Sequence, residues 1–261
     1  MSIASRRRFL QATCAGAISA SFGLASEPTL GMIFPPANYP VPPEAKQLYP
    51  HGVRFLAEGV GLERMTPEGY DKVIDKIVPA AQKLKKDGAT AIALMGTSLS
   101  FYKGAAFNRQ LAESITNATG LKSTTMSNGI VDGLRAVGGH RLAVATAYND
   151  EVNRRLQIFL KESGFEVLTI KGLGIERFED SPPVTHDSLF KFSAEVYDSA
   201  PQADSLLISC GALKTLDLLA PLEQRCKVPV VSSLPHALRA GVRLLGLTGQ
   251  AKGYGSLLAK A

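Results

Sequence analysis

The residues best suited to chemistry lie at two similar corners of the chain, and only one corner carries sulfur. The apolar run 91–95 ends in Gly96-Thr97-Ser98, and the run 205–209 ends in Cys210-Gly211. Both runs have the length and apolar content of a buried parallel strand, and such strands deliver their carboxyl ends to ligands in open α/β sheets. Two facing thiols could take a proton from one side of a carbon and return one on the other side. A single thiol at Cys210 can deliver a proton from one side only.

The two corners indicate an internal duplication. Gly96 and Cys210 are 114 positions apart, and the later segment 133–138 resembles the segment 241–246. In each pair, the two segments occupy corresponding places in the two halves of the chain. We therefore expect two related halves whose strand ends surround one cleft.

From residue 29 onward, the chain alternates apolar runs of strand length with segments of helical periodicity. Alternation of this kind predicts parallel sheets wrapped by helices. The predicted fold is α/β, with two pseudo-symmetric Rossmann-like or flavodoxin-like domains. One domain covers 29–140 and the other covers 141–257, and the chain is expected to exchange between them near the C-terminus. Strands are expected at 29–34, 91–95, 123–126, 141–146, 166–170, 205–209 and 229–232, and helices at 67–87, 105–119, 128–137, 150–163, 187–199, 213–225 and 237–245. Pro79 should kink or split the first of these helices.

The first 25 residues have the pattern of a twin-arginine signal peptide. Arginines 6–8 precede Phe9-Leu10, and the stretch 12–25 is apolar and rich in small residues. That stretch is short for a membrane span, which needs about 20 apolar residues. We expect cleavage near Ala25 and a periplasmic mature protein.

Charge and cysteine content narrow the possible partners. The net charge of +6 falls to +3 once the three leader arginines are removed, and the longest basic runs are pairs. This composition predicts no nucleic-acid partner and no stable membrane association after the signal is removed. Cys210 and Cys226 would lie at opposite ends of one helix, too far apart for a disulfide, so Cys210 should be a free thiol.

Hydroxyl and backbone donors gather at the predicted strand ends. Thr97, Ser98, Tyr148 and the N–H of Gly211 are donors suited to an anion, as in an oxyanion hole. The four histidines show no spacing typical of metal ligands, so no metal site is predicted. Cysteine hydrolase chemistry would need a base, and His236 is the one candidate. A thiol that stays protonated and gives its proton to a carbanion fits the absence of a dedicated base better.

Four segments resemble the arylmalonate decarboxylase family, within the aspartate/glutamate/hydantoin racemase and maleate isomerase superfamily. These segments are Gly31–Pro36, Met95–Phe107, Ala145–Tyr148 and Ser209–Gly211. The resemblance runs from about residue 29 to residue 257. It implies a cofactor-free decarboxylation of a disubstituted malonate, with an enediolate held by the oxyanion hole and protonated by Cys210. The superfamily's racemases carry a second cysteine where this chain has Gly96.

The resemblance also implies the walls of a substrate pocket. The expected lining residues are Pro35, Pro36, Leu62, Met65, Gly96, Leu99 and Phe178. Phe178 is bulkier than the family pattern, and Ser181 replaces an apolar residue. We therefore expect a small carboxylate substrate, either an arylmalonate or another compound. The protein is also expected to be a monomer.

Two other functions use the same residues. An exported carboxylate-binding protein would need the cleft and its donors but no thiol in the cleft. A racemase or isomerase of a small dicarboxylate or amino acid would need a second proton-transfer group on the Gly96 side, and the sequence offers none.

Overall fold

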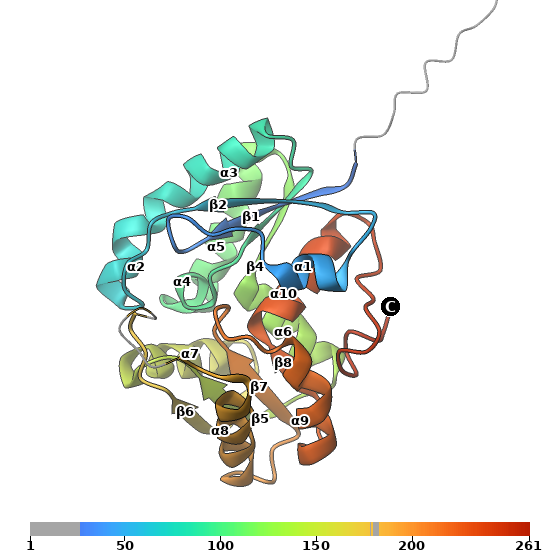
Figure 1. The fold of residues 1–261 in the computed structure, drawn as a ribbon. Helices are drawn as coiled ribbons and strands as arrows, with labels where there is room; N and C mark the ends of the chain where they lie inside the picture. Colours follow the sequence, from blue (N-terminus) through green and yellow to red (C-terminus); the bar gives the residue numbers. More distant parts are fainter. Residues whose placement is uncertain (1–26, 178, 180–182) are drawn as a thin grey trace, which may run out of the picture.

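The computed structural model describes residues 27–177, 179 and 183–261, which form two α/β lobes (Figure 1). The predicted signal peptide, Phe178 and Ser181 lie outside the described residues. In this part of the chain the strands form two four-stranded parallel sheets, ordered β2-β1-β3-β4 and β6-β5-β7-β8. The strands are β1 (Thr29–Phe34), β2 (Arg54–Gly59), β3 (Ala91–Leu94), β4 (Lys122–Thr125), β5 (Arg141–Thr146), β6 (Glu166–Gly172), β7 (Ser205–Ser209) and β8 (Val230–Ser232).

The two sheets have the same strand order when β1 to β4 are matched, in turn, to β5 to β8. The structure thus confirms the predicted α/β fold with two pseudo-symmetric parallel-sheet domains. The α-helices are α1 (Pro43–Leu48), α2 (Pro67–Val73), α3 (Ile77–Lys86), α4 (Thr97–Phe101), α5 (Gly104–Thr119), α6 (Met126–Ala136), α7 (Asp150–Glu162), α8 (His186–Asp198), α9 (Leu219–Cys226) and α10 (Ser233–Leu244).

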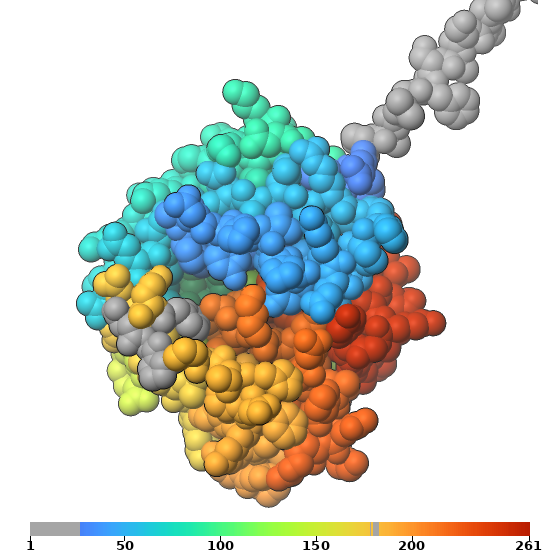
Figure 2. All heavy atoms as spheres, viewed as in Figure 1, coloured from blue at the N-terminus to red at the C-terminus, as the bar shows by residue number. Residues whose placement is uncertain are grey.

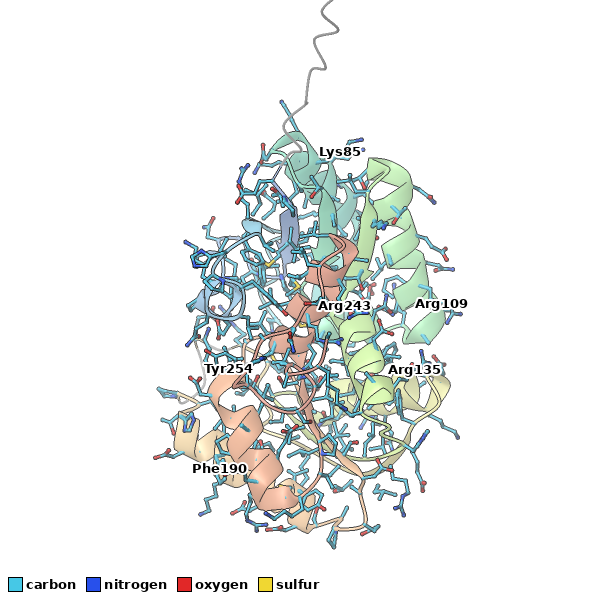
Figure 3. The ribbon with its side chains drawn as sticks, turned by 90° about the vertical axis from the view of Figure 1, so that its right-hand side faces the viewer. Lys85, Arg109, Arg135, Phe190, Arg243 and Tyr254 are labelled. Atoms are coloured by element: carbon cyan, nitrogen blue, oxygen red, sulfur yellow. The ribbon has the colours of Figure 1, made fainter. Side chains whose placement is uncertain are left out.

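The last helix crosses from the second lobe to the first. Although α10 follows β8 of the second sheet, it lies beside α6, where the lobes meet, and it contacts β3 and β4 (Figures 1 and 3). A Cβ on Gly241 would lie 2.7 Å from Cδ2 of Leu30 in β1, so glycine allows this close approach. The C-terminal half of α10 is therefore packed against β1 of the first lobe.

Buried apolar strands and side-chain caps account for several elements. Every residue of β1, β3 and β7 is buried, as expected for strands covered on both faces. The side chains of Thr66, Thr125 and Asn149 accept hydrogen bonds from backbone N–H groups at the starts of α2, α6 and α7. These caps fix where the helices begin and where the preceding loops end.

Three parts of the structure differ from the sequence-based prediction. The helix expected over 67–87 is interrupted by a 3-10 turn at Ile74–Lys76, and Pro79 is the third residue of α3, where its missing N–H costs no helical bond. The helix expected over 213–225 begins only after a 3-10 turn at Leu216–Leu218. The elements α1, β2 and α4 were not predicted.

The surface shows how the lobes meet. In Figure 2 the first lobe, in blue to cyan, adjoins the second lobe, in yellow to orange.

Among the described residues, no helix is long and apolar enough to cross a membrane. A large apolar core runs through both lobes, and a second core lies under β1, β3 and helices α2, α3 and α5 of the first lobe.

Candidate active site

A cavity of about 410 Å³ lies between the lobes, at the carboxyl ends of β1, β3 and β7. It brings together nearly all the described residues that the sequence predicted for the site. Those that line it are Pro35, Pro36, Leu62, Met65, Gly96, Thr97, Ser98, Tyr148, Cys210 and Gly211. Leu99 does not line the cavity: it is fully buried in the core of the first lobe, so its predicted place in the wall is wrong. Phe178 lies outside the described residues.

The end of β3 supplies one wall. Gly96 caps α4, and a Cβ at this position would lie 2.9 Å from Cγ of Pro35 and 3.1 Å from Cβ of Leu99. Leu99 therefore supports the corner from behind. The short helix α4 then turns Thr97 and Ser98, both buried, toward the cavity.

Cys210 occupies the matching position at the end of β7. Its side chain is 5% exposed, and its φ of 153° is one that L residues rarely adopt. Burial raises the pKa of the Cys210 thiol to about 11, although the N–H groups of Ala212 and Leu213 and the Tyr148 hydroxyl oppose this rise. The thiol is therefore protonated at neutral pH and suited to giving up a proton.

Tyr148 places a phenol at the same wall. The ring is 1% exposed and packs edge to face on Phe101, with centroids 5.8 Å apart. Its hydroxyl lies 3.4 Å from Ser209 Oγ. Burial raises the pKa of Tyr148 well above its ordinary value, and a charge on Cys210 would raise it further. Tyr148 is thus a hydrogen-bond donor at neutral pH.

Gly211 follows Cys210 and lies against the start of α6. A Cβ on Gly211 would lie 2.9 Å from both Sδ and Cε of Met126, which is fully buried. The glycine therefore keeps the backbone close to α6. Its N–H remains a candidate donor to a bound anion.

Several polar residues around the site were not predicted from the sequence. Ser233, the first residue of α10, accepts a hydrogen bond from the Cys210 N–H at 3.0 Å and lies 3.1 Å from Thr97 Oγ1. The Cys210 N–H is therefore already used. Burial raises the pKa of the Tyr70 phenol, and the nearby Ser98 hydroxyl opposes this rise.

The mouth of the cavity is charged. Arg64 pairs with Glu176, which also accepts a hydrogen bond from Nδ2 of Asn149 at 2.9 Å. Glu176 thereby connects the loop after β2 in the first lobe with the second lobe. Glu63, Arg177 and Glu179 lie at the same rim, and no role at the cavity was predicted for them from the sequence.

Among the described residues, His236 does not supply a base for the rival use of Cys210 as an activated nucleophile. His236 is buried in α10, its Nδ1 lies 2.9 Å from both backbone N and O of Ser232, and it does not line this cavity. Burial lowers the pKa of His236 to about 4. Cys210 and Cys226 are free thiols, as predicted, and no cluster of possible metal ligands occurs within the described residues.

Comparison with known proteins decides the family. The profile of the arylmalonate decarboxylase family matches residues 30–258. The chain belongs to the arylmalonate decarboxylase family. The arylmalonate decarboxylase of Bordetella bronchiseptica is 47% identical over 234 residues, which cover 89% of this chain and 97% of that protein. The family and the enzyme class expected from the sequence, a carboxy-lyase, are confirmed.

Solved structures extend the comparison. A liganded arylmalonate decarboxylase variant, with one glycine changed to cysteine and one cysteine to serine, matches with a TM-score of 0.86 and 46% identity over 89% of this chain and 99% of that one. The two changed residues are 114 positions apart, the same separation as Gly96 and Cys210. The maleate isomerase of Pseudomonas putida S16 matches with a TM-score of 0.80 at 19% identity over 90% of this chain and 98% of that one, which shows a shared fold.

Proposed function

We propose that this protein decarboxylates α-aryl or otherwise α-substituted malonates to enantioenriched monocarboxylic acids without an added cofactor. The observation that carries the proposal is one buried, free thiol, Cys210, in a cavity that also holds Thr97, Ser98 and Tyr148 as donors. Gly96, at the matching corner, has no group that could transfer a proton. Such a site can protonate a carbanion from one face but cannot interconvert two enantiomers.

The donors bind one carboxylate of the substrate. Thr97, Ser98, Tyr148 and the Gly211 N–H surround that carboxylate, while the second carboxylate faces the apolar side chains of Leu62 and Met65. A carboxylate without partners in such surroundings is costly, and breaking its bond to the central carbon as CO2 relieves that cost. The bonding electrons move into the retained carboxylate, and the resulting enediolate carries more charge on the oxygens that the donors already contact.

The thiol of Cys210 completes the reaction. Its proton moves to the planar central carbon, and the carbon–hydrogen bond forms on the face nearest β7. The sulfur is left as a thiolate, which takes a proton from water before the next turnover. The raised pKa of Cys210 keeps the thiol protonated at neutral pH and favours this return of a proton to the sulfur, while the donation itself is driven by the greater basicity of the enediolate carbon.

The direct test is CO2 release from a panel of α-substituted malonates by the purified protein beginning at residue 26. Phenylmalonate should be decarboxylated in the presence of a chelator as fast as in its absence. Cys210→Ala should lose most of the turnover while still folding. Activity that a chelator abolishes and a metal restores, or full activity in Cys210→Ala, would contradict the proposal.

We also propose that residues 1–25 direct export through the twin-arginine route and that the mature enzyme works in the periplasm. The basic and apolar pattern of the leader supports this, and the family match begins at residue 30, after the leader. Replacing Arg6 and Arg7 with lysine should retain the full-length protein in the cytoplasm of an expressing bacterium. Equal periplasmic amounts of the variant and the unmodified protein would contradict this route.

A further inference from the structure

Two stacked aromatic rings line the cavity, and neither has a task in the reaction described above. Phe34 is the last residue of β1, and Tyr39 follows it in the loop that leads to α1. Their ring centroids lie 4.4 Å apart, with an angle of 27° between the ring planes. Phe34 is 3% exposed, whereas Tyr39 is half-buried. Tyr39 thus presents an aromatic surface to the cavity and is backed by Phe34.

The chain holds Tyr39 in this position. Residues 35–42 contain four prolines, whose rings restrict φ and leave the loop few conformations. Beyond the loop, Oε1 of Glu44 in α1 lies 3.2 Å from Nζ of Lys214 in the second lobe. The Tyr49 hydroxyl donates a hydrogen bond to the Gly249 carbonyl oxygen at 2.8 Å. Because the loop starts from a buried strand and ends at these contacts, both of its ends are anchored.

The other walls of the cavity already have partners in the substrate. In the proposed reaction the hydroxyl donors hold one carboxylate, and Leu62 and Met65 face the other. The rim is charged, so an apolar substituent packed against it would remove water from those charges at a cost. Apart from Tyr148, the aromatic residues described at this cavity are Phe34 and Tyr39. Their stack is the surface left for the α-substituent.

We propose that Tyr39, backed by Phe34, is a specificity-determining residue that selects a flat aromatic ring as the α-substituent. This inference rests on the proposed function and deepens it, because it assigns the choice among α-substituents to one side chain. A flat ring can lie on the tyrosine in an offset or edge-to-face arrangement, which strengthens binding roughly 2- to 12-fold beyond the effect of the buried area. A saturated ring has no π system and gains nothing comparable.

Two ligands of matched size measure this preference. Phenylacetate and cyclohexylacetate share a carboxylate, a CH2 group and a six-carbon ring, but only the first ring is flat and aromatic. The readout is the ratio of their dissociation constants, measured by calorimetry on the mature protein, because changes common to both ligands cancel. In Tyr39→Leu the ratio should shift roughly 2- to 12-fold in favour of cyclohexylacetate. Tyr39→Phe keeps the ring and should keep the ratio of the unmodified protein.

Tyr254, labelled in Figure 3, offers a matched control. It is half-buried and packs on the same core as Tyr39, but it does not line the cavity. Tyr254→Leu should therefore leave the ratio unchanged, and melting temperatures of the three variants show whether each one folds. An unshifted ratio in Tyr39→Leu, or an equal shift in Tyr254→Leu, would overturn the inference.

A contact measurement replaces the ratio if Tyr39→Leu does not fold. Tyrosine is isotopically labelled in the unmodified protein and in Tyr39→Phe, and phenylacetate is added to each. The phenyl protons should give nuclear Overhauser effects to a tyrosine ring that is absent from the spectrum of Tyr39→Phe. Identical effects in the two proteins would place the phenyl ring elsewhere and overturn the inference.

Turnover separates this inference from the proposed function. The α-substituent contacts Tyr39 in both the bound substrate and the transition state, so Tyr39→Leu should raise KM for phenylmalonate more than it lowers kcat. A protein that binds phenylacetate but releases no CO2 from phenylmalonate contradicts the proposed function, while a shifted ratio in Tyr39→Leu still supports Tyr39. CO2 release with an unshifted ratio overturns the role of Tyr39 alone. If neither acetate binds, the inference is also overturned.

Discussion

At the scale of single residues, the account depends on whether Cys210 is a thiol or a thiolate. Burial among apolar groups favours the neutral form, and the three groups that oppose it do not outweigh desolvation. A cysteine hydrolase needs the opposite balance, with a base or a positive charge beside the sulfur. In the described part of the chain, the one candidate base, His236, is bonded to Ser232 in α10 and does not line the cavity.

We predict that the pKa of Cys210, raised to about 11, can be measured by alkylation. In mature protein with Cys226→Ser, the rate of reaction with iodoacetamide should rise with pH until about pH 11, well above the range of an ordinary thiol. Turnover should fall over the same range, because the donor must be protonated. Rapid alkylation of Cys210 at pH 7 would instead show a thiolate and favour nucleophilic chemistry.

A second residue-scale prediction concerns the phenol of Tyr148. Tyr148→Phe should lower kcat by roughly 10- to 1000-fold, the range for loss of one transition-state donor. Folding should change little, because the ring keeps its contact with Phe101. Full activity in this variant, measured by CO2 release from phenylmalonate, would leave Tyr148 with a packing role alone.

Sequence alone could predict the residues that end a strand but not those that reach them through the fold. Thr97, Tyr148 and Cys210 follow apolar runs, and the structure places all three at one cavity. Ser233 is 23 positions from Cys210 and 136 from Thr97, and its hydrogen bonds with both depend on α10 crossing to the first lobe. Leu99 was misplaced because a short helix after Gly96 turns it into the core.

At the scale of elements, burial decided which strands could be predicted. The fully buried runs of β1, β3 and β7 give a clear apolar signal. The strand β2 lies at the edge of its sheet, is only partly buried and contains Arg54 and Glu58, so its sequence lacks that signal. The helix α4 is five residues long, too short to show helical periodicity.

The helix α10 gives the chain a predictable acid sensitivity. Burial lowers the pKa of His236 to about 4, whereas an unfolded histidine titrates near 6.5. Between these values the unfolded chain binds a proton that the folded chain does not, so stability is full above pH 6.5 and falls as the pH drops toward 4. The loss should be on the order of 3 kcal/mol.

Urea unfolding from pH 4 to pH 8 measures this effect. In His236→Gln the amide can still bond to the Ser232 backbone but does not titrate, so the loss of unfolding free energy below pH 6.5 should be much smaller. Identical pH dependence in the two proteins would mean that His236 is not the group responsible.

At the scale of the whole molecule, the two lobes repeat one strand order and differ at the corners that face the cavity. The sulfur-bearing corner ends β7 and the glycine corner ends β3. A cysteine at position 96 would place its Cβ 2.9 Å from Pro35 Cγ, so the proline ring must shift slightly. We expect Gly96→Cys to fold with a loss of about 1–2 kcal/mol, measured by urea unfolding.

We further predict that the enzyme is a monomer. Sedimentation of the mature protein should give the mass of one chain at concentrations used for turnover. A stable dimer would contradict this and would make the charged rim around Arg64 and Glu176 the first surface to examine at the interface.

The central claim is that one thiol delivers the proton to one face, and the enantiomer of the product tests it most directly. The substrate should be α-methyl-α-phenylmalonate, and the product should be analysed by chiral chromatography. The unmodified protein should give one enantiomer, the double variant Gly96→Cys with Cys210→Ser should give its mirror image, and Gly96→Cys alone should interconvert the two. A racemic product from the unmodified protein, or the same enantiomer from the double variant, would contradict the account.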